Sequence, residues 1–77
     1  MPRIAQVSGS SVHVFPNDHP PPHVHALYQG RAVRLRISDG TVMDFARGFP
    51  AGVLRDVRTW LLENRDHAAA AWTRYHP

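Results

Sequence analysis

The stretch that decides the fold runs Arg31-Ala32-Val33-Arg34-Leu35-Arg36-Ile37-Ser38-Asp39-Gly40-Thr41-Val42-Met43-Asp44-Phe45. Val33, Leu35 and Ile37 alternate with polar residues, which is typical of a strand with one buried face. The Asp-Gly pair that follows is a strong signal for a two-residue hairpin turn. A turn of that length pairs residues across the hairpin in the order Ser38–Thr41, Ile37–Val42, Arg36–Met43 and Arg34–Phe45. We therefore expect a β-hairpin with this register.

Three further extended segments precede the hairpin. Ile4–Val7 and Val12–Phe15 are short apolar or alternating runs separated by Gly9-Ser10, and together they predict a first hairpin. His23–Tyr28 resumes an extended pattern and is closed by Gln29-Gly30. The chain is therefore expected to form an antiparallel sheet of four to five strands.

The last third of the sequence predicts helices. Pro50 suits the beginning of a helix, because proline has no N–H to satisfy and its backbone dihedral is already helical. The residues after it carry an apolar stripe at helical spacing: Val53, Leu54, Val57, Trp60 and Leu61. Asn64 or Asp66 is expected to cap a second helix that runs through Trp72 to Tyr75. The prediction is an α+β fold, with one long and one short C-terminal helix packed on one face of the sheet.

Length and composition set outer limits. Seventy-seven residues fit a single domain over residues 1–77, and association into a homo-oligomer would add buried surface to so small a core. The chain has no cysteine, which excludes disulfides and thiolate metal sites. The N-terminal residues lack the pattern of a secretory signal and no apolar run reaches membrane-spanning length, so we expect a cytoplasmic protein without a membrane association.

The positive charge is carried by arginine alone. All nine basic residues are arginine, against six acidic residues, which gives a formal net charge of +3. The guanidinium fork suits phosphate or carboxylate, so a polyanionic partner such as RNA, or an acidic protein, is one interpretation. A GC-rich coding sequence would produce the same composition, and this alternative stays open.

The segment richest in side chains that can bind a metal or transfer a proton is Asn17-Asp18-His19-Pro20-Pro21-Pro22-His23-Val24-His25. On a strand, His23 and His25 lie on one face, and the stiff proline turn can bring Asp18 or His19 back towards them. His13, on the neighbouring hairpin, can approach from the side. Three imidazoles and a carboxylate are suitable ligands for zinc or another divalent transition metal. The candidate metal ligands are therefore Asp18, His19, His23 and His25.

Two other interpretations of the histidines stay open. Imidazole pairs also act as general acid and base near neutral pH, which would make His19, His23 and His25 candidate catalytic residues in metal-independent RNA cleavage. Alternatively, the histidines hydrogen-bond to the donor-poor proline loop and hold its conformation. The spacing matches no strong metal signature.

Weaker candidates lie elsewhere on the sheet. Arg31, Arg34 and Arg36 could hold phosphates and Tyr28 could stack on a base, although a solvated strand face explains the arginines equally well. Asp44 is expected on the apolar face of the hairpin, at the sheet margin or paired with an arginine such as Arg47. The tryptophans are expected to anchor the core.

The quoted residues also resemble a known bacterial family. Met1-Pro2-Arg3-Ile4, followed by Phe15-Pro16-Asn17-Asp18-His19-Pro20-Pro21-Pro22-His23-Val24-His25-Ala26, is similar to the signature of the domain of unknown function 4160 family. The positions of Trp60 and Trp72 agree with this resemblance, which covers nearly the whole chain. It implies that Asn17, Asp18, His19, His23 and His25 are the motif positions. Family members often carry acidic residues where this chain has Arg34 and Arg36.

The resemblance also implies a biological setting. Members are commonly encoded beside a small protein of the domain of unknown function 2442 family, in an arrangement like that of toxin–antitoxin pairs. The leading hypothesis is a toxin-like component that acts on RNA as a nuclease, with His23 or His25 as general base or metal ligand and His19 as the acid. The alternatives are a non-catalytic binding module, or antitoxin-side subunit, that docks on the small cognate partner, and a small transition-metal-binding protein.

Overall fold

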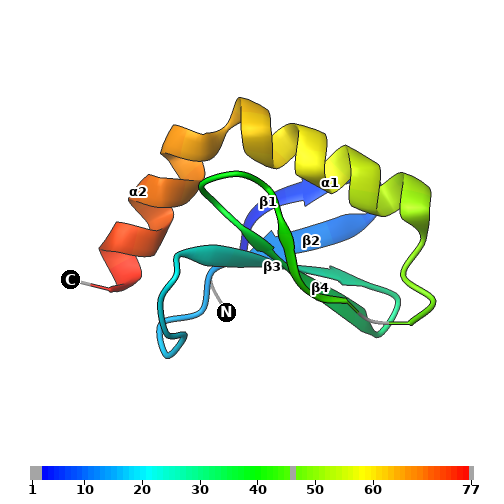
Figure 1. Cartoon of the computed structure of the whole chain (residues 1–77), viewed down its shortest axis with the longest axis horizontal. Coiled ribbons are helices and arrows are strands. Elements are labelled where there is room, and N and C mark those ends of the chain that lie inside the picture. Colours follow the sequence, from blue (N-terminus) through cyan, green and yellow to red (C-terminus); the bar gives the residue numbers. More distant parts are fainter. Residues whose placement is uncertain (1–2, 46, 77) are drawn as a thin grey trace.

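The structure is a computed structural model, and it describes residues 3–45 and 47–76. Five strands are followed by two helices (Figure 1): β1 (Arg3–Val7), β2 (Ser10–His13), β3 (His23–Tyr28), β4 (Arg31–Arg36), β5 (Val42–Phe45), α1 (Ala51–Glu63) and α2 (Arg65–Tyr75). The predicted α+β fold, with its antiparallel sheet and two C-terminal helices, is confirmed. Within the described residues, neither helix has both the length and the apolar run needed to cross a bilayer.

The sheet is a simple meander. Its strand order is β1-β2-β3-β4-β5, and each neighbouring pair is antiparallel. Two-residue turns join β1 to β2 at Ser8-Gly9 and β3 to β4 at Gln29-Gly30, and all four turn residues have positive φ. Positive φ at both central residues is the geometry that matches the twist of a tight hairpin. The long connection between β2 and β3 carries the histidine-proline segment.

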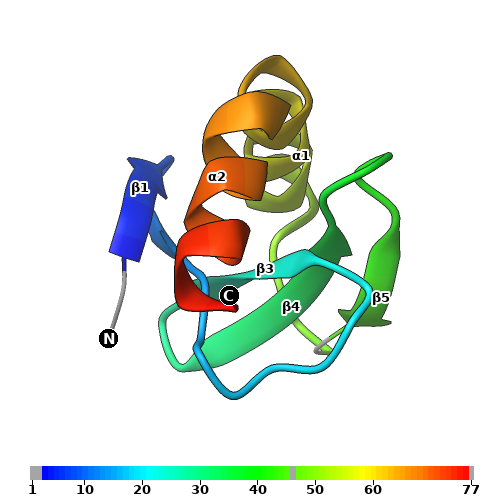
Figure 2. The ribbon, with the colours of Figure 1, turned by 90° about the vertical axis from the view of Figure 1, so that its left-hand side faces the viewer.

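Both helices lie on the same side of the sheet (Figure 2), where they cover one set of alternating strand side chains. The buried core consists of Val12, Val14, Val24, Ala26, Val33, Leu35, Ile37, Phe49, Val57, Leu61, Ala68, Ala71 and Trp72. Trp72 is buried and Trp60 packs against the core from its edge, so the expectation that both tryptophans serve the core is confirmed. The apolar stripe of α1 was also predicted correctly, with Val57 and Leu61 at its centre.

The predicted register of the second hairpin is wrong. Leu35 lies opposite Val42 and Arg34 opposite Asp44, with a bulge in between, instead of Ile37 opposite Val42. The connection is longer than two residues because Asp39 makes other contacts: its carboxylate pairs with the Arg36 guanidinium and accepts the Thr41 backbone N–H at 3.0 Å. Two-residue turns form at Ser8-Gly9 and at Gln29-Gly30, but not at Asp39-Gly40.

The bulge changes the face on which Asp44 lies. Asp44 was expected on the apolar face, but it lies opposite Arg34 on the other face, and its side chain is 67% exposed. The extra residue, Met43, shifts the alternation by one position, and such a shift exchanges the two faces of a strand. Asp44 lies on the edge strand β5 and pairs with an arginine, as the sequence suggested, but this arginine is Arg34 and not Arg47.

Candidate metal centre

The loop between β2 and β3 returns Asp18 to the beginning of β3. The Asp18 backbone N–H donates to the Phe15 carbonyl at 3.3 Å, which closes a turn, and three prolines complete the connection. At the other end, the Ile37 N–H donates to the Pro22 carbonyl at 3.0 Å, so the loop is attached to the strand next to β3. Asp18 thus faces the side chains at the beginning of β3, as the proline turn led us to expect.

Three side chains converge at this point. One carboxylate oxygen of Asp18, Oδ2, lies 2.7 Å from His25 Nε2 and 3.3 Å from His23 Nε2. One ligand atom from each of these residues falls within 4.8 Å of the other two, which is close enough for a shared metal ion. The cluster lies mostly below the surface, with side-chain exposures of 21% for Asp18, 2% for His23 and 16% for His25. The predicted sharing of one strand face by His23 and His25 is confirmed.

The orientation of His23 is fixed by the proline loop. Its Nδ1 lies 2.8 Å from the Pro21 carbonyl oxygen, and because a carbonyl only accepts, Nδ1 carries the hydrogen. A neutral His23 then has an unprotonated Nε2. This buried atom has no hydrogen-bond partner among the described residues, since the 3.3 Å approach to Asp18 lacks hydrogen-bond geometry. A buried lone pair that faces a carboxylate is unfavourable unless a cation or a proton lies between them.

His25 is kept neutral by its surroundings. Burial is the largest cause that lowers the pKa of His25, and the charges of His23 and Arg34 act in the same direction. The hydrogen bond and charge of Asp18 oppose them but do not reverse the shift. At neutral pH the ring is therefore uncharged, and its Nε2 carries the hydrogen donated to Asp18 at 2.7 Å. Metal binding at Nε2 requires this hydrogen to move to Nδ1, since metals bind only the deprotonated nitrogen.

Aromatic rings enclose the pair of histidines. Phe15 packs edge-on against His25, with ring centroids 4.5 Å apart, and Trp72 from α2 lies 5.3 Å from His23. An apolar wall of this kind lowers the local dielectric and strengthens the interaction of a bound cation with its ligands. His13 stacks on Phe15 and its Nε2 bonds to Ser11 Oγ at 2.9 Å.

Two sequence candidates are not among the converging ligands. His13 lies opposite His25 on the neighbouring strand, but its ring contacts Ser11 and Phe15 instead of Asp18. His19 is exposed at the surface of the loop and supplies none of the three ligand atoms. The structure thus brings together Asp18, His23 and His25 from the predicted set of four.

Arg34 and Arg36 lie beside the cluster. In the pairing of β3 with β4, Arg34 is opposite His25 and Arg36 is opposite His23, so these four side chains share one face of the sheet. Arg34 Nε lies 3.5 Å from Asp44, and Arg36 pairs with Asp39 and Thr41. The two guanidiniums remain close to the surface, with exposures of 38% and 40%.

The other two nucleic-acid candidates are placed differently. Arg31 lies on the opposite face of β4 and donates to the Arg47 carbonyl at 2.9 Å. Tyr28 packs towards Phe49, with ring centroids 6.1 Å apart, and is partly buried. The structure therefore does not gather Tyr28, Arg31, Arg34 and Arg36 on one surface.

Comparison with known protein families shows to which family the chain belongs. A family model described as a domain of unknown function (DUF4160) matches residues 9–73, which include the whole cluster and both tryptophans. The chain belongs to this family. Comparisons with curated proteins and with solved structures gave no match.

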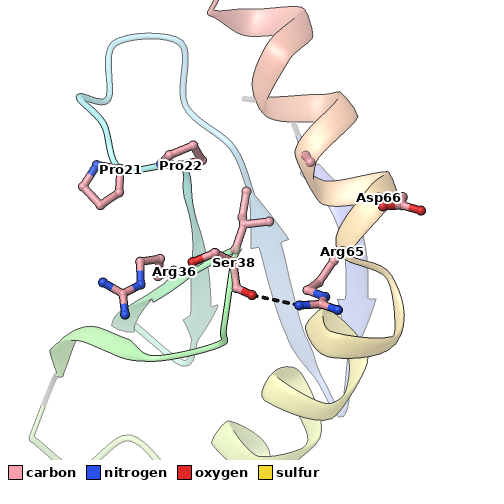
Figure 3. A pocket seen from close by; sticks show the side chains of 8 residues that line it. Pro21, Pro22, Arg36, Ser38, Arg65 and Asp66 are labelled. Carbon is pink, nitrogen blue, oxygen red and sulfur yellow. Dashed lines mark hydrogen bonds between the residues drawn. The ribbon is translucent and has the colours of Figure 1, made fainter.

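One pocket of this DUF4160 protein lies next to the cluster of Asp18, His23 and His25, and none of these three residues lines it. Its cavity volume is about 420 Å³, and Figure 3 shows it between the proline loop and the beginning of α2. The lining residues are Pro21, Pro22, Arg36, Ile37, Ser38, Arg65, Asp66 and Ala69. Arg65 closes one side by donating to the Ser38 carbonyl at 2.9 Å. Sequence reasoning missed Arg65, because nothing in the pattern of α2 relates it to a loop some forty residues earlier.

The chemistry of this DUF4160 cluster follows from its ligand set. Two imidazoles and one carboxylate are borderline ligands suited to zinc and its neighbours, and they leave a fourth position open. The bond from His23 Nδ1 to a backbone carbonyl is the arrangement that commonly fixes the ring of a metal-bound histidine. His23 is too deeply buried to reach a large substrate directly, so metal ligation fits its position better than direct proton transfer.

Proposed function

We propose that the domain binds one divalent transition-metal ion, zinc or a close neighbour, through Asp18 Oδ2, His23 Nε2 and His25 Nε2. The observation that carries this proposal is the buried, unpartnered Nε2 of His23, which faces the Asp18 carboxylate while Nδ1 is committed to Pro21. A cation between the nitrogen and the carboxylate removes the electrostatic conflict. It also gives the lone pair a partner that no described side chain provides.

The local geometry supports this reading with a small adjustment. Tetrahedral ligands at about 2.0–2.1 Å from zinc are separated by roughly 3.3 Å. The separation of 3.3 Å between Asp18 Oδ2 and His23 Nε2 already has this value, and that of 2.7 Å between Asp18 Oδ2 and His25 Nε2 has to widen by about 0.6 Å. Asp18 is the residue that would move, because it lies on a loop while both histidines lie on a strand.

Titration calorimetry with zinc chloride on tag-free protein tests the proposal. We expect one ion per chain for the native protein. Asp18→Asn, His23→Asn and His25→Gln should each weaken binding by at least tenfold to a hundredfold, by analogy with changes close to known metal sites. His19→Gln and His67→Gln are the matched controls, because both histidines are exposed and outside the cluster. Binding that is lost with a control, or that survives all three cluster variants, would contradict the proposal.

The toxin-like nuclease role stays a prediction, and so does docking on a small cognate protein. What supports a hydrolytic role is the open fourth position, where a metal-bound water could be activated near neutral pH. In that mechanism Asp18, His23 and His25 act as ligands. His19 keeps the role of general acid that the sequence suggested, from its exposed place on the same loop.

A further inference from the structure

A continuous row of side chains crosses the sheet beside the cluster. Successive strand pairings place Arg3 opposite His13, His13 opposite His25, His25 opposite Arg34, and Arg34 opposite Asp44. All five side chains therefore share one face of the sheet, opposite the face that carries Val12, Val24 and Leu35. Positive charge lies on both sides of the two histidines in this row.

A second pairing extends this charge. Arg36 is the direct neighbour of His23, as Arg34 is of His25. Directly opposite residues in an antiparallel pair have Cβ atoms about 4.5–5.5 Å apart, a distance that an arginine side chain spans easily.

The present partners of the two arginines differ in strength. Arg34 Nε is buried and has no hydrogen-bond partner among the described residues, because its 3.5 Å contact with Asp44 is an ion pair without hydrogen-bond geometry. Asp44 is itself 67% exposed, and exposed ion pairs of this kind contribute little to stability. Arg36 is held by Asp39 on an exposed loop. Arg34 can therefore turn to another anion at small cost, whereas Arg36 has to share or exchange the two contacts that it makes with Asp39.

We propose that Arg34, Arg36 and the bound metal ion together hold the phosphoryl group of a phosphate ester. This inference rests on the metal site proposed above. One phosphoryl oxygen would take the open position on the metal, and the guanidiniums would bind the remaining oxygens. Arginine suits this task because its planar fork matches two oxygens of one phosphate. The carboxylate of Asp18 stays a metal ligand, whereas Asp44 competes with the phosphate for Arg34.

The test uses cobalt-loaded native protein and phenylphosphonate as the probe. The visible spectrum of bound Co²⁺ reports the metal, and the ³¹P relaxation rate reports phosphonate close to it. We expect Arg34→Gln and Arg36→Gln each to weaken phosphonate binding roughly tenfold, as expected for loss of a hydrogen bond to a charged group. Asp44→Asn should tighten phosphonate binding, because it removes the carboxylate that competes for Arg34. Arg55→Gln is the matched control, because this substitution makes the same change in charge and the side chain of Arg55, on α1, is 79% exposed.

The outcomes separate the two proposals. If Co²⁺ gives no cluster-dependent spectrum, both fail. If Co²⁺ binds but phosphonate affinity is the same in native protein, Arg34→Gln and Arg36→Gln, only the phosphoryl proposal is overturned. Circular dichroism of each variant checks that the sheet persists. Competition by a short oligouridylate would assign the phosphoryl group to a nucleic-acid backbone, and its absence, with phosphonate still bound, would assign it to a small phosphate ester.

Discussion

His23 donates its Nδ1 hydrogen to the Pro21 carbonyl at 2.8 Å, and as a result its other ring nitrogen faces Asp18 at 3.3 Å. The proline loop thus does two things at once. Its backbone orients one imidazole, and its aspartate supplies the third potential ligand. The structural and the metal-binding interpretations of the histidines describe the two nitrogens of the same ring.

The variants His23→Asn and His23→Ala should separate the hydrogen bond to Pro21 from the metal-facing ring nitrogen. The asparagine amide can keep a donor near the Pro21 carbonyl but supplies no ring nitrogen to a metal. Alanine removes both and leaves a cavity against Trp72. We expect His23→Ala to lower the free energy of unfolding by about 2–4 kcal/mol, and His23→Asn by clearly less. Urea unfolding with chelator present measures both, and equal losses would show that the Pro21 bond adds nothing.

Metal binding should be visible in tryptophan fluorescence. Trp72 lies 5.3 Å from His23 between ring centroids, so a paramagnetic ion such as Cu²⁺ at the cluster should quench it strongly at one equivalent. Trp60 lies on α1 near His67 and provides the internal control. In the Trp72→Phe variant, one equivalent of Cu²⁺ should leave most of the Trp60 fluorescence unquenched. Equal quenching of both tryptophans would point to non-specific binding.

Acid should destabilise the metal-free protein. Burial is the main cause that lowers the pKa of His13, and the charges of Arg3 and His25 add to it. The folded state therefore holds His13 neutral where the unfolded chain, with its ordinary pKa of about 6.5, already takes up a proton. Stability is complete above this value and is lost progressively as pH falls from about 6.5 to the lowered pKa. The pKa of His25 is also lowered, mainly by burial, so this residue adds to the loss of stability at low pH.

Thermal unfolding between pH 5 and 8 in the presence of chelator measures this effect. His13→Gln should flatten the pH dependence, because glutamine does not titrate, while the contribution of His25 remains. His67→Gln is a control with an exposed ring. A native protein that gains stability as pH falls through this range would contradict the assignment.

Two glycines should respond to alanine in opposite directions. Gly40 has a φ of +73°, and a Cβ there would lie 3.2 Å from Arg58 Cγ. Gly52 lies in α1 with open space around it. We expect Gly40→Ala to cost about 1–2 kcal/mol and Gly52→Ala to stabilise by up to about 1 kcal/mol. Denaturant unfolding of both variants measures these two effects.

The sequence was informative where periodicity decides the outcome. The alternation around Val33 and Leu35, and the stripe through Val57 and Leu61, predicted the covered face and its helix correctly. The same two-residue period placed His23 and His25 on one side of β3. Proline stiffness predicted that the loop returns to the strand, and Asp18 does so.

Other features depend on contacts that periodicity does not encode. The hairpin register shifted because Asp39 binds Arg36 and the Thr41 N–H, which a turn motif alone does not reveal. The tautomer of His23 depends on a backbone carbonyl, and every residue has one. The pocket next to Pro21 includes Arg65 from a helix distant in sequence. Such contacts need the three-dimensional arrangement.

The most direct test of the metal centre is a long-range ¹H–¹⁵N correlation spectrum of the six histidine rings before and after one equivalent of Zn²⁺. Without metal, we expect His23 to be protonated at Nδ1 and unprotonated at Nε2. With metal, the Nε2 resonances of His23 and His25 should move to metal-bound positions, while the other four rings stay unchanged. An Nε2 of His23 that carries a proton throughout, or a zinc response centred on His19 or His67, would contradict the account.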